Sequence, residues 1–100
     1  MRSIRTADFI KQLDALPVHV QEQARAGFQL WKQDPLRVGW HRLQGVPAPI
    51  YAAEIGLRWR ALAVVDKATD TCVWSFIGSH ETYNKVIERY RHTPPRVRLR

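Results

Sequence analysis

Residues 50–66 read IYAAEIGLRWRALAVVD, and this stretch of two apolar runs around a glycine decides the fold. The runs 50–55 and 57–66 have the length and the apolar content of β-strands, while Gly56 permits a tight turn. We expect a hairpin with a two-residue turn centred on Gly56-Leu57. A third strand is expected at residues 72–77, after the polar turn KATDT at 67–71. The middle and last strands are apolar on both faces, which predicts central strands of a sheet that is covered on both sides.

The segments on either side of these strands show the apolar spacing of helices. Residues 7–16, and the segment between Pro17 and Asp34-Pro35, each repeat apolar side chains three or four positions apart. Pro17 ends the first helix or lies in the first turn of the second, and Asp34-Pro35 ends the second. Residues 80–91 show the same spacing. The apolar positions are Phe9, Ile10, Leu13, Leu16, Val20, Ala24, Phe28, Trp31, Tyr83, Val86, Ile87 and Tyr90. This order predicts an α+β fold, in which an N-terminal helical hairpin packs on a twisted antiparallel β-sheet with a C-terminal helix.

The length and composition fit one domain. One hundred residues, 45% hydrophobic and 25% charged, predict a single globular domain spanning 1–100. Residues 36–49 are expected to form a loop with one short strand near 40–43, and the tail 92–100 is expected to be mobile. No apolar run approaches about 20 residues and the start, MRSIRTADF, lacks the apolar core of a signal peptide, so we expect a cytoplasmic location. The single cysteine, Cys72, fits a reducing compartment.

The charge is strongly and unevenly basic. Sixteen Lys and Arg against nine Asp and Glu give a net charge of +7. Residues 1–35 hold five basic and four acidic side chains, so residues 36–100 hold the remaining eleven and five, a net of +6. Such an excess indicates a polyanionic partner, most simply nucleic acid, and the alternative is a basic surface that only confers solubility.

Several kinds of chemistry are poorly supported. The four histidines, at positions 19, 41, 80 and 92, show no metal-ligand spacing, and with a lone cysteine they argue against a structural zinc site. The sequence has no glycine-rich phosphate loop, and none of its three serines lies in a nucleophile-elbow motif.

Two arginines flank Trp59 in the second expected strand. Strand alternation places Arg58 and Arg60 on one face and Trp59 on the other. Arg58 is most simply a solvated charge or a partner of Glu54 across the hairpin. Arg60 lies inside an otherwise apolar strand, where a guanidinium needs an anion or an unusual environment. We therefore expect Arg60 to bind an anion.

His80 follows the last strand, after Gly78 and Ser79, at the expected start of a helix. Histidine gives and accepts protons near neutral pH, and a helix N-terminus favours anions such as phosphate. His80 is therefore a candidate proton-transfer group. In the alternative interpretation, Ser79 caps the helix and His80 is merely exposed in its first turn.

Taken together, these motifs resemble a known family. A helical hairpin ending in Leu-Pro is followed by WHRLQG at 40–45, RWRAL at 58–62, and IGSH at 77–80 with Tyr83 three residues later. In this order they resemble the RelE/ParE superfamily of type II toxin–antitoxin toxins, over residues 9–90.

The resemblance implies a small α+β toxin that cleaves mRNA, commonly on the ribosome, without metal or cofactor. It assigns the family's strand arginine to Arg60, its histidine to His80 and its helix aromatic to Tyr83, and we expect all three to be catalytic. Further RNA contacts are expected from Arg42, Arg58 and Arg89. Trp40 is a candidate for stacking on a base, whereas Trp59 is expected in the core.

Two departures from the family pattern are visible. The lysine-rich strand of some ribosome-dependent members is absent, and the chain offers Arg37, His41 and Arg42 there instead. A second active-site arginine after Gly78 is also not evident. Two alternatives therefore stay open: a toxin of the same fold that inhibits DNA gyrase by protein binding, and a catalytically silent relative that binds RNA or antitoxin. A toxin, whether it cleaves mRNA or inhibits gyrase, implies a cognate antitoxin, which should be acidic and encoded nearby.

Overall fold

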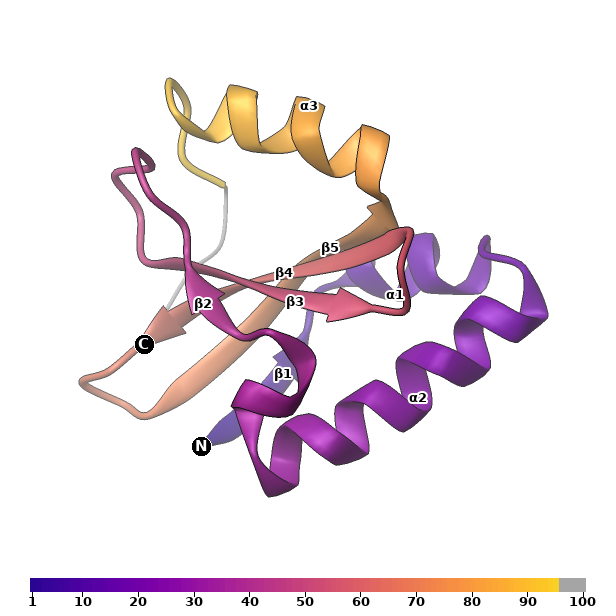
Figure 1. Ribbon diagram of the computed structural model, residues 1–100. Coiled ribbons are helices and arrows are strands. Elements are labelled where there is room, and N and C mark those ends of the chain that lie inside the picture. The colour runs from indigo at the N-terminus through magenta and orange to yellow at the C-terminus, as the bar shows by residue number, and fades with distance from the viewer. Residues whose placement is uncertain (96–100) are drawn as a thin grey trace.

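The computed structural model describes residues 1–95, which form three α-helices, one short 3-10 helix and a five-stranded sheet (Figure 1). In chain order the elements are β1 (Arg2–Arg5), α1 (Ala7–Asp14), α2 (Val18–Gln33), η1 (Pro35–Val38), β2 (His41–Arg42), β3 (Ile50–Ile55), β4 (Trp59–Asp66), β5 (Thr71–Ser79) and α3 (His80–Tyr90). Of the tail expected at 92–100, residues 96–100 lie outside the described part of the chain. No helix among the described residues is long and apolar enough to cross a membrane.

The sheet has the strand order β1-β5-β4-β3-β2. Strands β2 to β5 are antiparallel neighbours, as predicted, but β1 runs parallel to β5 at the edge, with Arg2 opposite Thr71 and Arg5 opposite Trp74. The expectation of a wholly antiparallel sheet is therefore wrong at this edge. All four residues of β1 are exposed, so its sequence carries no alternation that could reveal a strand.

The two faces of the sheet carry separate cores. Helices α1 and α2 lie on one side of the sheet and α3 on the other (Figure 1). On the side of α1 and α2, Trp31, Trp40 and Trp74 meet with ring centroids 5.3–5.5 Å apart. Helix α3 covers the other face through Tyr83 and Val86. Because both faces are covered, the central strands β4 and β5 are buried along most of their length, which confirms the prediction from their apolar sequence.

Side-chain caps fix the starts of α1 and α3. The Thr6 hydroxyl accepts a hydrogen bond from the N–H of Phe9 and donates one to the carbonyl of Trp74, so it ties α1 to β5. The Ser79 hydroxyl accepts from the N–H of Thr82 and so caps α3. The strand β5 therefore runs directly into the capped N-terminus of α3.

The loop between β3 and β4 differs from the predicted two-residue turn. Ile55 pairs with Trp59, so the loop has three residues, 56–58, and Gly56 adopts a left-handed φ of 61°. Arg58 consequently lies in the loop rather than in the strand. The expected strand at 57–66 begins at Trp59 instead, and β5 is longer than the expected 72–77.

Candidate functional site

Arg60 lies on the α3 side of the sheet. It alternates along β4 with Leu62 and Val64, which belong to the core under α3. Across the sheet, Glu54 of β3 and Gly78 of β5 lie directly opposite Arg60. The three residues form one row near the end of the sheet where α3 begins, and in this row the only charged groups are a carboxylate and a guanidinium.

The Arg60 guanidinium curls over the 56–58 loop. Its Nη1 donates to the carbonyl oxygen of Trp59 at 2.8 Å and lies 3.4 and 3.5 Å from those of Leu57 and Gly56. From the sequence we expected an anion to bind the Arg60 guanidinium. In the structure, these backbone carbonyls provide part of its hydrogen bonding. The hydrogen bonds that Arg60 makes to described residues use Nη1, which leaves Nη2 and Nε for a bound group.

His80 begins α3 beside the same loop. Its backbone N–H donates a 2.7 Å hydrogen bond to the carbonyl of Arg58, and its ring Nδ1 lies 3.4 Å from the side-chain amide nitrogen of Asn84. The ring centroid is 5.6 Å from that of Tyr83. His80 is exposed, so a ligand can reach this residue.

Tyr83 is buried behind His80, with 8% of its surface exposed. Burial raises the pKa of the Tyr83 hydroxyl above its usual 10.0, while the positive charge of Arg60 lowers that pKa and the negative charge of Glu54 raises it further. The hydroxyl therefore lies close enough to sense both charges. It is neutral near pH 7 and keeps its proton for a hydrogen bond to a ligand.

Glu54 is a member of this cluster that sequence reasoning assigned only as a possible partner of the arginines. Its carboxylate lies against Gly39: a Cβ added at Gly39 would be 2.5 Å from Oε2. Gly39 has a left-handed φ of 64°, so both its backbone and the close approach of Glu54 require glycine. The sequence feature that could have identified Glu54 as a site residue is that it is the single acidic residue in the apolar strand IYAAEI.

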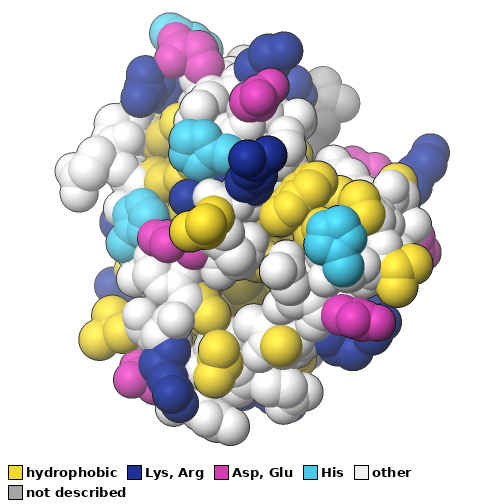
Figure 2. All heavy atoms as spheres, turned by 45° about the vertical axis from the view of Figure 1, so that its right-hand side comes forward, with side chains coloured by type: hydrophobic (Ala, Val, Ile, Leu, Met, Phe, Trp, Pro, Cys, Tyr) yellow, Lys and Arg dark blue, Asp and Glu magenta, His cyan; other side chains and the backbone are white. Residues whose placement is uncertain are grey.

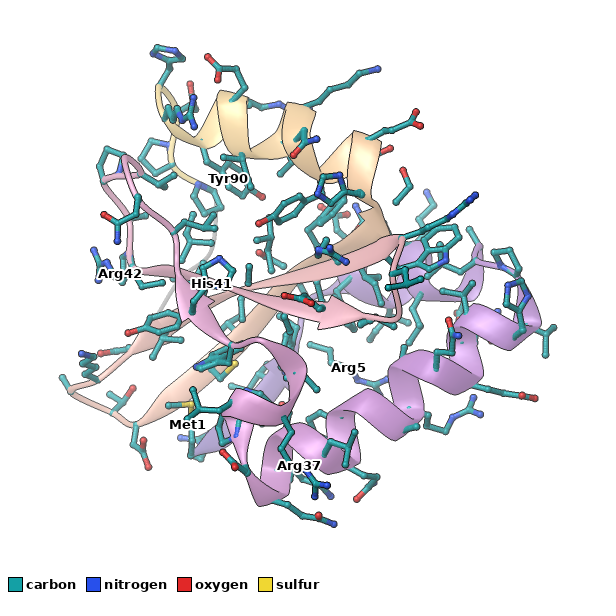
Figure 3. The ribbon with its side chains drawn as sticks, in the orientation of Figure 1. Met1, Arg5, Arg37, His41, Arg42 and Tyr90 are labelled. Atoms are coloured by element: carbon teal, nitrogen blue, oxygen red, sulfur yellow. The ribbon has the colours of Figure 1, made fainter. Side chains whose placement is uncertain are left out.

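His41, which the sequence offered only as one of three residues in place of a lysine-rich strand, lies on the α3 side of the sheet. It pairs with Ala52, whose side chain belongs to the core under α3, and its Nδ1 lies 2.7 Å from the carbonyl oxygen of Gly39. Figure 3 shows the His41 ring on the side of β2 that faces α3. A two-residue strand is too short for its alternation to reveal this placement.

The three arginines expected to contact RNA do not come together. Arg58 lies in the loop beside His80, whereas Arg42 pairs with Tyr51, on the opposite face from Arg60, and extends from the outer edge of the sheet (Figure 3). Arg89 lies in the last turn of α3, nine residues or about 13 Å along the helix from His80.

The two candidate tryptophans both pack in the aromatic core. Trp40 stacks on Tyr51 with centroids 5.1 Å apart and contacts Trp31 and Trp74, so it is not presented for base stacking. Trp59 packs against the same core, as expected.

Figure 2 shows one side of the molecule with all heavy atoms drawn as spheres. On this side, histidine, basic and acidic side chains lie next to one another, above a hollow with a hydrophobic floor. A cavity of about 460 Å³ lies between α2 and the sheet and is lined mainly by apolar side chains, among them Phe9, Phe28, Trp31, Ala53, Ile55 and Trp74. Glu54 is also among the residues that line it.

No protein-family model and no curated protein matches the sequence. Solved structures do match. The chain is similar to the RelBE2 toxin–antitoxin complex of Mycobacterium tuberculosis (22% identity over 79% of this chain and 96% of that chain, TM-score 0.63). It is similar to the RelB–RelE complex of Methanococcus jannaschii (14%, 83% and 96%, TM-score 0.66) and to the isolated E. coli RelE toxin (17%, 88% and 96%, TM-score 0.62). The chain therefore has the RelE fold, which confirms the resemblance at the level of the fold.

Proposed function

We propose that this RelE-fold chain is the toxin of a type II toxin–antitoxin system and an endoribonuclease that cleaves mRNA, without metal or cofactor, and so inhibits translation. The observation that carries the proposal is the convergence of Arg60, His80 and Tyr83 at one corner of the sheet, next to Glu54. Two similar structures are complexes of a toxin with its antitoxin, which supports an antitoxin partner for this chain.

The proposed reaction is attack of a ribose 2′-hydroxyl on the adjacent phosphate. The new bond joins the 2′-oxygen to phosphorus, the bond from phosphorus to the 5′-oxygen breaks, and the products are a 2′,3′-cyclic phosphate and a 5′-hydroxyl. The reaction needs a base for the 2′-proton, an acid for the 5′-oxygen and positive charge beside the phosphorane.

Arg60 is the residue for the phosphorane charge. Its Nη1 is held by the loop carbonyls, so the free Nη2 and Nε edge has a fixed direction for two phosphate oxygens. Positive charge held in place before the reaction stabilises the transition state without reorganisation.

His80 is the proton-transfer residue. The form that donates a proton to the leaving 5′-oxygen is the imidazolium, which carries a proton on both ring nitrogens, and the Asn84 side chain, 3.4 Å from Nδ1, helps to orient the ring. Tyr83, like an ordinary tyrosine, is neutral near pH 7, and burial raises its pKa further, so it acts by orienting substrate or His80 rather than as a base.

The remaining basic residues would contact RNA phosphates at different distances from the cleaved bond. Arg58 is the arginine next to His80, and Arg42 and Arg89 would contact RNA, from the mRNA or the ribosome, further from the cleaved bond. The net charge of +7 also favours an acidic antitoxin that covers the α3 side of the sheet.

An in vitro translation reaction tests the proposal. The wild-type chain is expected to cut mRNA within the reading frame, and Arg60→Ala is expected to leave it intact. Intact mRNA with wild-type protein, together with inhibited supercoiling in a gyrase assay, would support the protein-binding toxin. Intact mRNA without gyrase inhibition, from a chain that is harmless alone and binds no neighbouring gene product, would support the silent relative.

A further inference from the structure

The 56–58 loop presents a fully exposed leucine beside the candidate catalytic residues. Leu57 is 93% exposed, more than any other large hydrophobic side chain among the described residues. Its carbonyl oxygen is 3.4 Å from Arg60 Nη1, and the carbonyl of the next residue, Arg58, accepts from the N–H of His80. The loop that carries Leu57 is therefore in contact with Arg60 and His80, the two residues that the proposed reaction needs.

This loop is held from three sides. Arg60 contacts its carbonyls from β4, His80 bonds to it from α3, and the side chain of Gln23 on α2 lies against Gly56, where an added Cβ would be 3.3 Å from Oε1. These contacts fix the backbone of the loop. Leu57 is thus an apolar side chain on a fixed backbone, and the described residues leave 93% of it exposed.

In-line cleavage of RNA supplies a use for such a side chain. The 2′-oxygen, the phosphorus and the leaving 5′-oxygen must lie on a line, and a stacked strand does not hold them so. Apolar side chains, leucine among them, separate neighbouring bases by inserting between them. Unstacked bases are also the form in which proteins read single-stranded RNA.

We propose that Leu57 is a wedge that inserts between the two bases flanking the cleaved phosphate of the substrate mRNA. The inference rests on the proposed ribonuclease function. Charge favours an RNA strand as the occupant, because Arg58 and Arg60 follow Leu57 closely in the chain and no acidic residue lies in the loop. Insertion beside Arg60 places the unstacked step where the phosphate oxygens are bound.

The test compares two RNA substrates in single-turnover cleavage. One has all its bases, and the other has an abasic sugar directly 3′ of the cleaved phosphate, so that there is no stack to open. On the complete substrate, Leu57→Ala is expected to lower kcat/KM roughly ten- to hundredfold, the range for losing a buried leucine side chain. On the abasic substrate it is expected to match the wild type.

The matched control is Leu36→Ala, which removes another exposed leucine, 77% exposed on η1, and should match the wild type on both substrates. Both variants should melt at the wild-type temperature. An equal loss on the two substrates, no loss on either, or loss of antitoxin affinity alone would each overturn the wedge while wild-type cleavage leaves the proposed function standing. Failure of the wild type to cleave the complete substrate would overturn both.

Discussion

Glu54 and Arg60 lie directly opposite each other in the β3–β4 ladder, with both side chains on the α3 side, and yet they form no ion pair in the described part of the chain. The Arg60 guanidinium points instead to the carbonyls of Trp59 and of the 56–58 loop, and the Glu54 carboxylate lies over Gly39. A cation that is held by neutral carbonyls keeps its positive charge uncompensated at contact distance. It is therefore available to a phosphate.

Removal of the Arg60 guanidinium should abolish cleavage. We expect Arg60→Ala to lower the cleavage rate at least ~100-fold, the scale for losing one transition-state charge donor. Arg60→Lys should recover little, because an ammonium cannot bind two phosphate oxygens in the fork geometry. Both rates are measured on mRNA with the melting temperature alongside, since Nη1 also supports the loop. Arg25→Ala, on α2, is the control for loss of a charge, and growth arrest by Arg60→Ala at wild-type expression would contradict the assignment.

Substitution of His80 should affect chemistry but not folding. The hydrogen bond to Arg58 uses the His80 backbone, and the helix cap uses the Ser79 hydroxyl, so both survive in His80→Gln. A proton-transfer group contributes roughly 10²–10⁴-fold to rate, and we expect a loss in that range with unchanged melting temperature and RNA affinity. His92→Gln, two residues beyond the C-terminal end of α3, is the matched control. Normal cleavage by His80→Gln would reduce His80 to an exposed first-turn residue.

The sequence predicted the helices, the hairpin strands and the face of Arg60, because alternation and apolar spacing encode which side of an element is buried. It did not predict the row of Glu54, Arg60 and Gly78, because register depends on loop length. A two-residue turn at 56–57 would have placed Glu54 opposite Trp59. The third loop residue, Arg58, sets Glu54 opposite Arg60 instead. The strand β1 was missed for a different reason: its pairing with β5 is made by the backbone and leaves every side chain exposed.

Gly27→Ala should stabilise the protein. Gly27 lies inside α2, and a Cβ added there would meet nothing within 4 Å, because the position faces the cavity between α2 and the sheet. Glycine in a helix interior is about 1 kcal/mol less favourable than alanine. We expect a gain of that size in the free energy of unfolding, measured by urea denaturation. A loss of stability would show that α2 packs more tightly on the sheet than this cavity allows.

Alkaline pH should destabilise the fold through Cys72. Burial of this thiol raises its pKa from 9.0 to about 12, against a smaller opposite effect of the N-terminal charge. Because the folded-state pKa is the higher one, the unfolded thiol ionises first, so the stabilising contribution is complete below pH 9 and is lost between pH 9 and 12. Tyr83 and Tyr90, whose pKa values are raised by burial above 10.0, add to the loss only above pH 10. Between pH 9 and 10, the unfolding free energy of Cys72→Ala should therefore fall less steeply than that of the wild type, and equal slopes would show that ionisation of this thiol is not the cause of the loss.

Two glycine substitutions should separate backbone strain from the contact of Glu54. Gly39 and Gly45 both have left-handed φ angles, 64° and 71°, so alanine costs each roughly 1–2 kcal/mol of backbone strain. At Gly45 the added methyl meets nothing within 4 Å, whereas at Gly39 it would lie 2.5 Å from Glu54 Oε2 and must displace that carboxylate. We expect Gly39→Ala to be the less stable variant in urea denaturation, because the added methyl must displace the Glu54 carboxylate. Combining Gly39→Ala with Glu54→Ser should restore stability to the level of Gly45→Ala. Equal stabilities for the two single variants would show that Glu54 does not rest against Gly39 in solution.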